Sequence, residues 1–180
     1  MKASPGGRCC GRLRRWPLLL ALVLAAACGR DEGAASGTAP APAAIDGQED
    51  AVCGMVVREQ PAPRAQVLHA DGERAFFCSL GDLLVYLSAP SPHGAVRAVF
   101  VEVLDGDGRS LTPQTGPHPW RRADDAVYVV GVARRGIMGA AVLAYADAAL
   151  AEGVAAAHSG AQVRDFAQLQ QWWRARQAAR

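Results

Sequence analysis

The sequence lacks the short motifs that mark most enzymes and closed metal sites. It contains no C-x-x-C pair, no G-x-S-x-G turn and no glycine-rich phosphate loop. Its four histidines lie far apart, so they do not form the clustered ligand pattern of a structural zinc site. These absences disfavour zinc and leave no positive evidence for catalysis.

Long apolar runs are absent as well. The most apolar segment, "PLLLALVLAAAC", has a core of about 11 residues, whereas a transmembrane helix requires about 20. It follows a basic start with Lys2 and four arginines, which is typical of a signal peptide over residues 1–27. The alanines before Cys28 approximate the bacterial lipoprotein pattern, so we expect cleavage there and a lipid thioether on Cys28. An ordinary cleaved signal and an uncleaved anchor are the alternatives.

Removal of this leader reverses the sign of the net charge. The whole chain carries a formal charge of +2, but residues 1–27 hold five of its 19 basic residues and none of its 17 acidic ones. The remainder has 14 basic residues and a charge of −3, so the composition gives no argument for a nucleic-acid partner. Only Cys53 and Cys78 then remain beyond Cys28, and an exported protein could join them as a disulfide.

The composition of residues 28–51 predicts a flexible tether. Ile45 is their one large apolar side chain, so the segment can bury too little apolar surface to fold. A coil of this length would hold the next domain about 25 Å from the lipid on average. Residues 52–180 have the length of one ordinary domain.

The residue pattern of this domain predicts an α+β fold. The order strand, strand, helix, strand occurs twice in it, over about 52–104 and 120–170. Antiparallel sheets and a final helix over "DFAQLQQWWRARQAAR" complete this expectation. The expected strands and helices, in chain order, are "VCGMVV", "AQVLH", "DGERAFF", the helix "SLGDLLVYL", "AVRAVFVEVL", "AVYVVGV", a turn at "ARRG", "IMGAAVLAY" and the helix "ADAALAEGVAAAH".

Two sulfur atoms stand close together in the first expected strand. Alternate side chains of a strand share a face, so Cys53 and Met55 would project to the same side. A thiolate and a thioether suit Cu(I) far better than Mg, Ca or Mn. The alternative is that Met55 packs in the core and Cys53 is an inert small apolar residue, and spacing alone favours that interpretation.

Two further sulfurs could join them. Met138 stands between Gly136 and Gly139, which would let its backbone turn tightly and approach another segment, although core packing is its default role. Cys78 precedes an expected helix N-terminus, which would favour its thiolate if it were exposed. Cys78 could be a reserve ligand, a disulfide partner of Cys53, or a buried inert residue.

The order of several segments resembles the NosL family, the nitrous oxide reductase accessory lipoproteins. The resemblance covers about residues 53–169. The segments that carry it are "CGMVV", "FFCSLGDLLVYL", "ADDAVYVVG", "RRGIMGA" and "HSGAQVRDF".

This resemblance implies two ββαβ-like units, similar to the organomercurial lyase core. It implies a non-enzymatic periplasmic protein, lipid-anchored to a bacterial envelope membrane, that binds one Cu(I). The copper would serve assembly of nitrous oxide reductase in denitrification, with that enzyme or its assembly transporter as partner. Cys53, Met55 and Met138 match the ligand positions of the family. Ile137, the residue before Met138, departs from the family pattern.

This chain also departs from the family at Glu102 and Val103, because many relatives carry a histidine in that segment. Its absence leaves Cys78 and His158 as further candidate ligands. Two other interpretations stay open. One is an envelope lipoprotein without metal and with a structural Cys53–Cys78 disulfide, and the other is an enzyme related to the organomercurial lyases.

Overall fold

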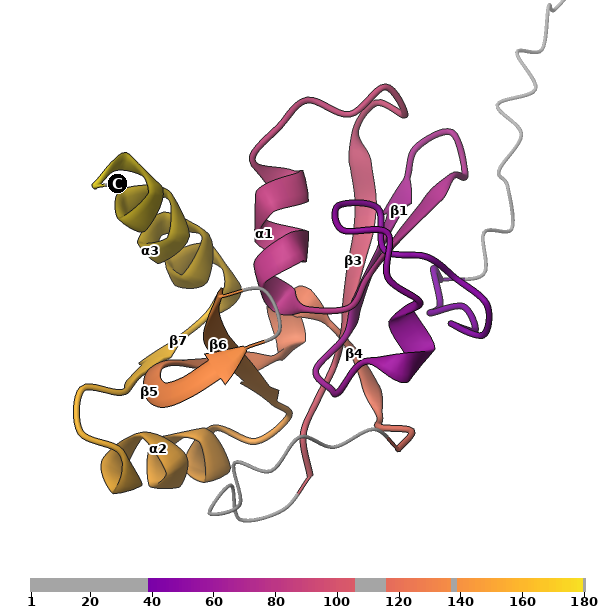
Figure 1. Ribbon diagram of the computed structural model, residues 1–180. Coiled ribbons are helices and arrows are strands. Elements are labelled where there is room, and N and C mark those ends of the chain that lie inside the picture. Colours follow the sequence, from indigo (N-terminus) through magenta and orange to yellow (C-terminus); the bar gives the residue numbers. More distant parts are fainter. Residues whose placement is uncertain (1–38, 106–115, 137–138, 180) are drawn as a thin grey trace, which may run out of the picture. The chain divides into compact units, whose positions relative to one another are not determined.

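The computed structural model describes residues 39–105, 116–136 and 139–179, which form two antiparallel sheets with three α-helices (Figure 1). The first sheet has the order β2-β1-β3-β4 and the second β6-β5-β7. The strands are β1 (Ala65–His69), β2 (Arg74–Phe77), β3 (Val96–Glu102), β4 (Trp120–Arg122), β5 (Val127–Gly136), β6 (Gly139–Tyr145) and β7 (Gln162–Arg164). The α-helices are α1 (Leu80–Leu87), α2 (Ala148–Ala157) and α3 (Phe166–Ala178), and the 3₁₀ helices are η1 (Val57–Glu59) and η2 (Ala123–Asp125).

The predicted α+β class and its repetition are confirmed. The order β1-β2-α1-β3 is followed by β5-β6-α2-β7, so two ββαβ units occur in succession. The predicted C-terminal helix is α3, and it begins with a capping box in which Asp165 and Gln168 each accept a backbone N–H from the other. The short strand β4 was not predicted.

The two units share one hydrophobic core. Helix α1 contacts β1 and β2 of the first sheet and β6 of the second. The largest cluster of buried side chains accordingly includes Phe77 of β2, Leu83 of α1, Val101 of β3, Val130 of β5 and Leu169 of α3. Both the end of β2 and the start of α1 are therefore held in place by the core.

The strand predicted for "VCGMVV" is wrong. Residues 51–53 form a turn, Val56 makes only an isolated antiparallel bridge with Glu49, and η1 follows. The turn closes because the Gly54 N–H donates to the Asp50 carbonyl at 2.9 Å, while the Asp50 N–H donates to the Met55 carbonyl at 2.8 Å. Gly54 has φ +73°, a value that glycine adopts without steric cost.

A second correction concerns "ARRG", which was predicted as a turn. Strand β5 continues through these residues to Gly136. Strand β6 begins at Gly139, whereas the sequence placed the start of this strand at Ile137.

The packed region begins before residue 52. Ile45, in the expected tether over 28–51, is 5% exposed and packs with Val57 and Phe76, and Asp50 is 4% exposed. Residues 1–38, with the expected signal peptide and Cys28, lie outside the described residues, so that part of the domain division stays a prediction. None of the helices in the described part has both the length and the apolar character that a membrane crossing requires.

Candidate metal centre

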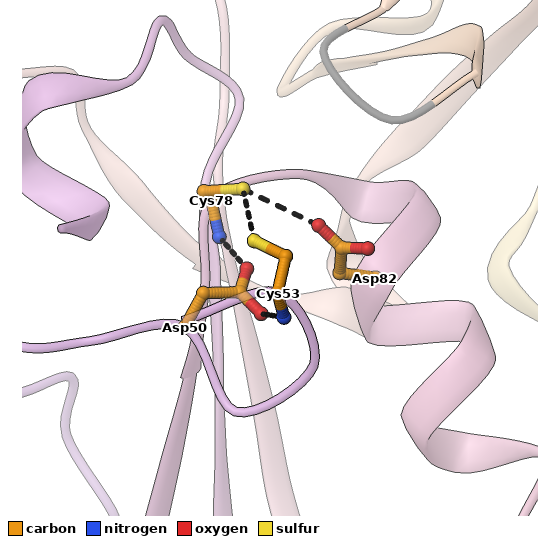
Figure 2. A group of neighbouring side chains, drawn as sticks. All are labelled: Asp50, Cys53, Cys78 and Asp82. Atoms are coloured by element: carbon orange, nitrogen blue, oxygen red, sulfur yellow. Dashed lines mark hydrogen bonds between the residues drawn. The ribbon is translucent and has the colours of Figure 1, made fainter. Parts of the chain in front are cut away.

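Two cysteines that are 25 residues apart in the sequence meet in the structure. The Sγ atoms of Cys53 and Cys78 lie 3.5 Å apart and are not bonded to each other (Figure 2). Cys53 is half-buried in the turn, whereas Cys78 is fully buried between β2 and α1. The predicted place of Cys78 just before a helix N-terminus is confirmed, since Ser79 is the N-cap of α1.

The carboxylate of Asp50 fixes the backbone of both cysteines. Its Oδ1 accepts the N–H of Val52 at 2.7 Å and of Cys53 at 3.0 Å, and its Oδ2 accepts the N–H of Cys78 at 2.5 Å. Burial acts to raise the pKa of Asp50, but the backbone hydrogen bonds from Cys78, Cys53 and Val52 together hold it below its ordinary value. Asp50 is thus an ionised positioning residue that joins two distant segments.

A second carboxylate reaches the sulfurs from the first turn of α1. The Oδ2 atom of Asp82 accepts a hydrogen bond from the Cys78 thiol at 3.3 Å and one from the Ser79 hydroxyl at 3.0 Å. Its backbone N–H donates to the Ser79 Oγ at 3.1 Å, which caps the helix. Burial raises the pKa of Asp82, although the hydrogen bond from Cys78 opposes the change.

The surroundings of both sulfurs favour the protonated thiol form. Burial raises the pKa of the Cys78 thiol strongly, and its hydrogen bonds with Asp50, Asp82 and Cys53 act in the same direction. Burial also raises the pKa of Cys53, and the backbone N–H of Met55 only partly offsets it. A metal ion that binds here must therefore displace protons from the sulfurs.

The four side chains have the spacing of a metal site. One ligand atom from each of Asp50, Cys53, Cys78 and Asp82 lies within 4.8 Å of the others, and no second such group of His, Cys, Asp or Glu occurs among the described residues. A sulfur separation of 3.5 Å would let one ion contact both sulfurs with metal–sulfur bonds of about 2.3 Å.

The chemistry of the donors favours a soft ion. Two thiolates select monovalent copper over hard cations, which prefer oxygen. The oxygens of Asp50 already accept three backbone N–H groups, so the sulfurs are the available donors on that side of the site. The ionised Asp50 places negative charge beside any bound cation.

The predicted methionine ligands have different outcomes. Met55 follows the turn that holds Cys53 and is half-buried, so the predicted shared strand face does not occur. Met138 lies outside the described residues, so its part in the site stays a prediction.

Cys78, a secondary candidate from the sequence, is the residue that the structure places at the Cys53 sulfur. His158, the other secondary candidate, is the C-cap of α2 and does not belong to the four-residue group. Its Nε2 atom is buried and has no hydrogen-bond partner among the described residues.

Sequence reasoning missed both carboxylates. Asp82 stands in the first turn of the predicted helix "SLGDLLVYL", but its contact with the Cys78 thiol was not predicted. Asp50 stands in a polar, low-complexity stretch, and its position three residues before Cys53 is the one local signal of a side-chain-closed turn.

The residue at the missing histidine position has a structural role. Glu102 is 1% exposed, and it pairs with the equally buried Arg64 through distances of 2.5 Å to Nε and 2.8 Å to Nη2. The guanidinium also donates to the carbonyls of Arg58, Gln60 and Gly116. Glu102 therefore anchors the segment after the cysteine turn instead of facing the sulfurs.

A domain of two ββαβ units in which a turn and a helix N-terminus present a pair of thiols is suited to binding a soft metal ion. The family model NosL matches residues 42–173, so this chain belongs to the NosL family.

Individual relatives agree with this assignment. The chain is 30% identical over 149 residues to the copper-binding lipoprotein NosL of Stutzerimonas stutzeri, covering 81% of this chain and 76% of that protein. It is 36% identical over 89 residues to the copper-binding lipoprotein NosL of Achromobacter cycloclastes, covering 49% of this chain and 46% of that protein. The crystal structure of the copper chaperone NosL from Shewanella denitrificans superposes with a TM-score of 0.59 and 26% identity, covering 71% of this chain and 94% of that one.

Proposed function

We propose that this protein is a copper chaperone that carries one Cu(I) ion between the sulfurs of Cys53 and Cys78. The observation that carries the proposal is the 3.5 Å separation of two unbonded thiols from distant segments. The names of the NosL relatives supply copper as the metal, and the softness of two thiolates favours its monovalent state. Met55 and Met138 are the proposed sources of a third, thioether ligand.

The unequal burial of the two cysteines supports transfer by ligand exchange. Cys53 is half-buried on an exposed turn, so a donor or acceptor protein can offer its own ligand from that side. Cys78 is buried and retains the ion from within the fold. Copper would therefore enter and leave through Cys53 without a change of oxidation state.

The cellular setting is part of the same proposal. Lipidation at Cys28 would tether the domain to a bacterial envelope membrane on the periplasmic side. Its partner would be nitrous oxide reductase or the transporter that assists assembly of that enzyme. The lipoprotein names of two relatives support the anchor, and the resemblance of the sequence motifs supports the partner.

An anaerobic Cu(I) titration against a competing chromophoric chelator tests the metal site. The purified full-length chain should have Cys9, Cys10 and Cys28 replaced by serine, so that only Cys53 and Cys78 carry thiols. We expect one tightly bound Cu(I), weaker binding after Cys53→Ser or Cys78→Ser, and loss of tight binding in the double variant.

Exposed Ser159→Ala is the matched control, and it should bind as the parent does. Tight binding that survives in the double variant would show that the sulfur pair is not the site.

A further inference from the structure

We propose that Cys53 and Cys78 form a reversible thiol–disulfide couple in which Cys53 attacks a disulfide oxidant and Cys78 resolves the mixed disulfide. We infer that the resulting intramolecular disulfide excludes copper. Only this exclusion rests on the proposed copper function, because the couple itself requires no metal.

The geometry places the two sulfurs close to bonding distance. A disulfide bond is about 2.05 Å long, so Sγ atoms that lie 3.5 Å apart must approach by about 1.5 Å. Asp50 already holds the backbone N–H groups of both cysteines. Cys53 lies in a turn that ends at Gly54, where φ is +73°, so the closing movement falls on a short exposed segment.

The burial of the two residues assigns their roles. Cys53 is half-buried and can be reached by a small disulfide from solvent, whereas Cys78 has 0% exposure. Thiol–disulfide exchange requires access to the attacking sulfur, so Cys53 is the sulfur that meets the oxidant. Cys78 contacts only groups within the fold, among them the Cys53 sulfur, and it is placed for the second, intramolecular step.

With glutathione disulfide as the oxidant, the reaction balances without another reagent. Cys53 loses its proton and attacks one glutathione sulfur, the glutathione disulfide bond breaks, and one glutathione leaves as a thiolate that takes up a proton. Cys78 then loses its proton and attacks the Cys53 sulfur, which releases the second glutathione. The protein loses two protons and two electrons, and the two glutathione thiols that form take them up.

Copper binding and disulfide formation compete because they use the same two sulfur atoms. A sulfur in a disulfide has no thiolate charge with which to hold a soft cation, and a thiolate bound to copper is not free to attack a disulfide. The reduced protein is therefore the form that loads copper, and the loaded protein resists oxidation.

Mass spectrometry after treatment with glutathione disulfide tests the couple in the full-length background with serine at positions 9, 10 and 28. The parent should lose both thiols and keep no glutathione. Cys78→Ser should retain one glutathione on Cys53, and folded Cys53→Ser should stay unmodified, with near-native circular dichroism as the check on folding. Persistence of both thiols in the parent, or glutathione on Cys78 but not on Cys53, would overturn the couple.

A Cu(I) titration of the reduced and oxidised parent tests the exclusion separately. We expect one bound Cu(I) in the reduced form, none held tightly in the oxidised form, and recovery after treatment with a dithiol that is then removed. Equal binding by both forms would refute the exclusion while the couple stands. Failure of the reduced form to bind would refute the proposed copper function, and the mass result would still decide the couple.

Discussion

Replacing Asp50 with asparagine should disconnect the two cysteines while preserving side-chain size. The carboxylate accepts three backbone N–H groups, two on Oδ1 and one on Oδ2. Asparagine offers one oxygen, which can keep the Val52 and Cys53 hydrogen bonds, but its amide nitrogen then faces the N–H of Cys78. Two donors in contact leave the buried Cys78 N–H without an acceptor.

The expected loss follows from that geometry. A hydrogen bond to a charged group contributes about 1.5–3 kcal/mol, and an unsatisfied buried donor costs about 1–3 kcal/mol. Because these terms overlap at the Cys78 N–H, we expect Asp50→Asn to lower the free energy of unfolding by about 2–4 kcal/mol at neutral pH. Cu(I) affinity should also fall, since the sulfurs are no longer held together.

Urea denaturation at several pH values is the assay. The pKa of Asp50 is lowered in the folded state, so its contribution is complete above the unfolded value of about 3.9 and is lost as the pH falls through the folded value. The difference between parent and variant should therefore shrink in acid. The exposed pair of Asp46 and Arg58 provides a matched control, because Asp46→Asn should cost less than about 1 kcal/mol. Equal stability of parent and Asp50→Asn at neutral pH would show that the carboxylate does not hold the two cysteine segments together.

Three other perturbations have defined outcomes. Asp82→Asn should stabilise the metal-free protein at neutral pH, because the pKa of Asp82 is raised in the folded state and its ionisation therefore disfavours the fold as the pH rises. The gain should vanish at a pH below the unfolded pKa of Asp82. Thermal melts at neutral pH and at that acidic pH measure the difference. Gly131→Ala should lower the free energy of unfolding by about 1–3 kcal/mol, because Gly131 has φ +82° and an added Cβ would lie 2.4 Å from the Gly160 carbonyl oxygen. Urea denaturation measures this loss. Gly153→Ala is the control, since its added Cβ meets no atom within 4 Å. Arg64→Met should cost about 3–5 kcal/mol by leaving Glu102 buried and unpaired, and a second substitution of Glu102 by leucine should recover much of the loss in the same melts.

Local patterns were sufficient for the repeated units because each element carries its own signal. Leu80, Leu83 and Leu84 face the core from α1, and their spacing within the predicted helix "SLGDLLVYL" is typical of a helix with one buried face. The two β-rich halves and the final helix were likewise read from alternation and periodicity. These patterns specify which face of each helix or strand is buried, and they involve only residues that are close together in the chain.

The cysteine turn could not be predicted from the same signals. Val52, Val56 and Val57 give the segment strand propensity, but the Asp50 carboxylate and the left-handed Gly54 close it into a turn. The hydrogen bond from Cys78 to Asp50 joins residues 28 apart, and no local pattern encodes such a contact. The sequence therefore identified Cys53 and Cys78 as candidates but not the turn that brings their sulfurs together.

Copper-edge X-ray absorption of the Cu(I)-loaded protein can show whether Cys53 and Cys78 both bind the ion. We expect at least two sulfur neighbours at about 2.3 Å in the parent with serine at positions 9, 10 and 28. Cys78→Ser, loaded to the same level, should lose one of these sulfurs. An identical sulfur shell in the two proteins would contradict the claim that Cys53 and Cys78 hold the metal together.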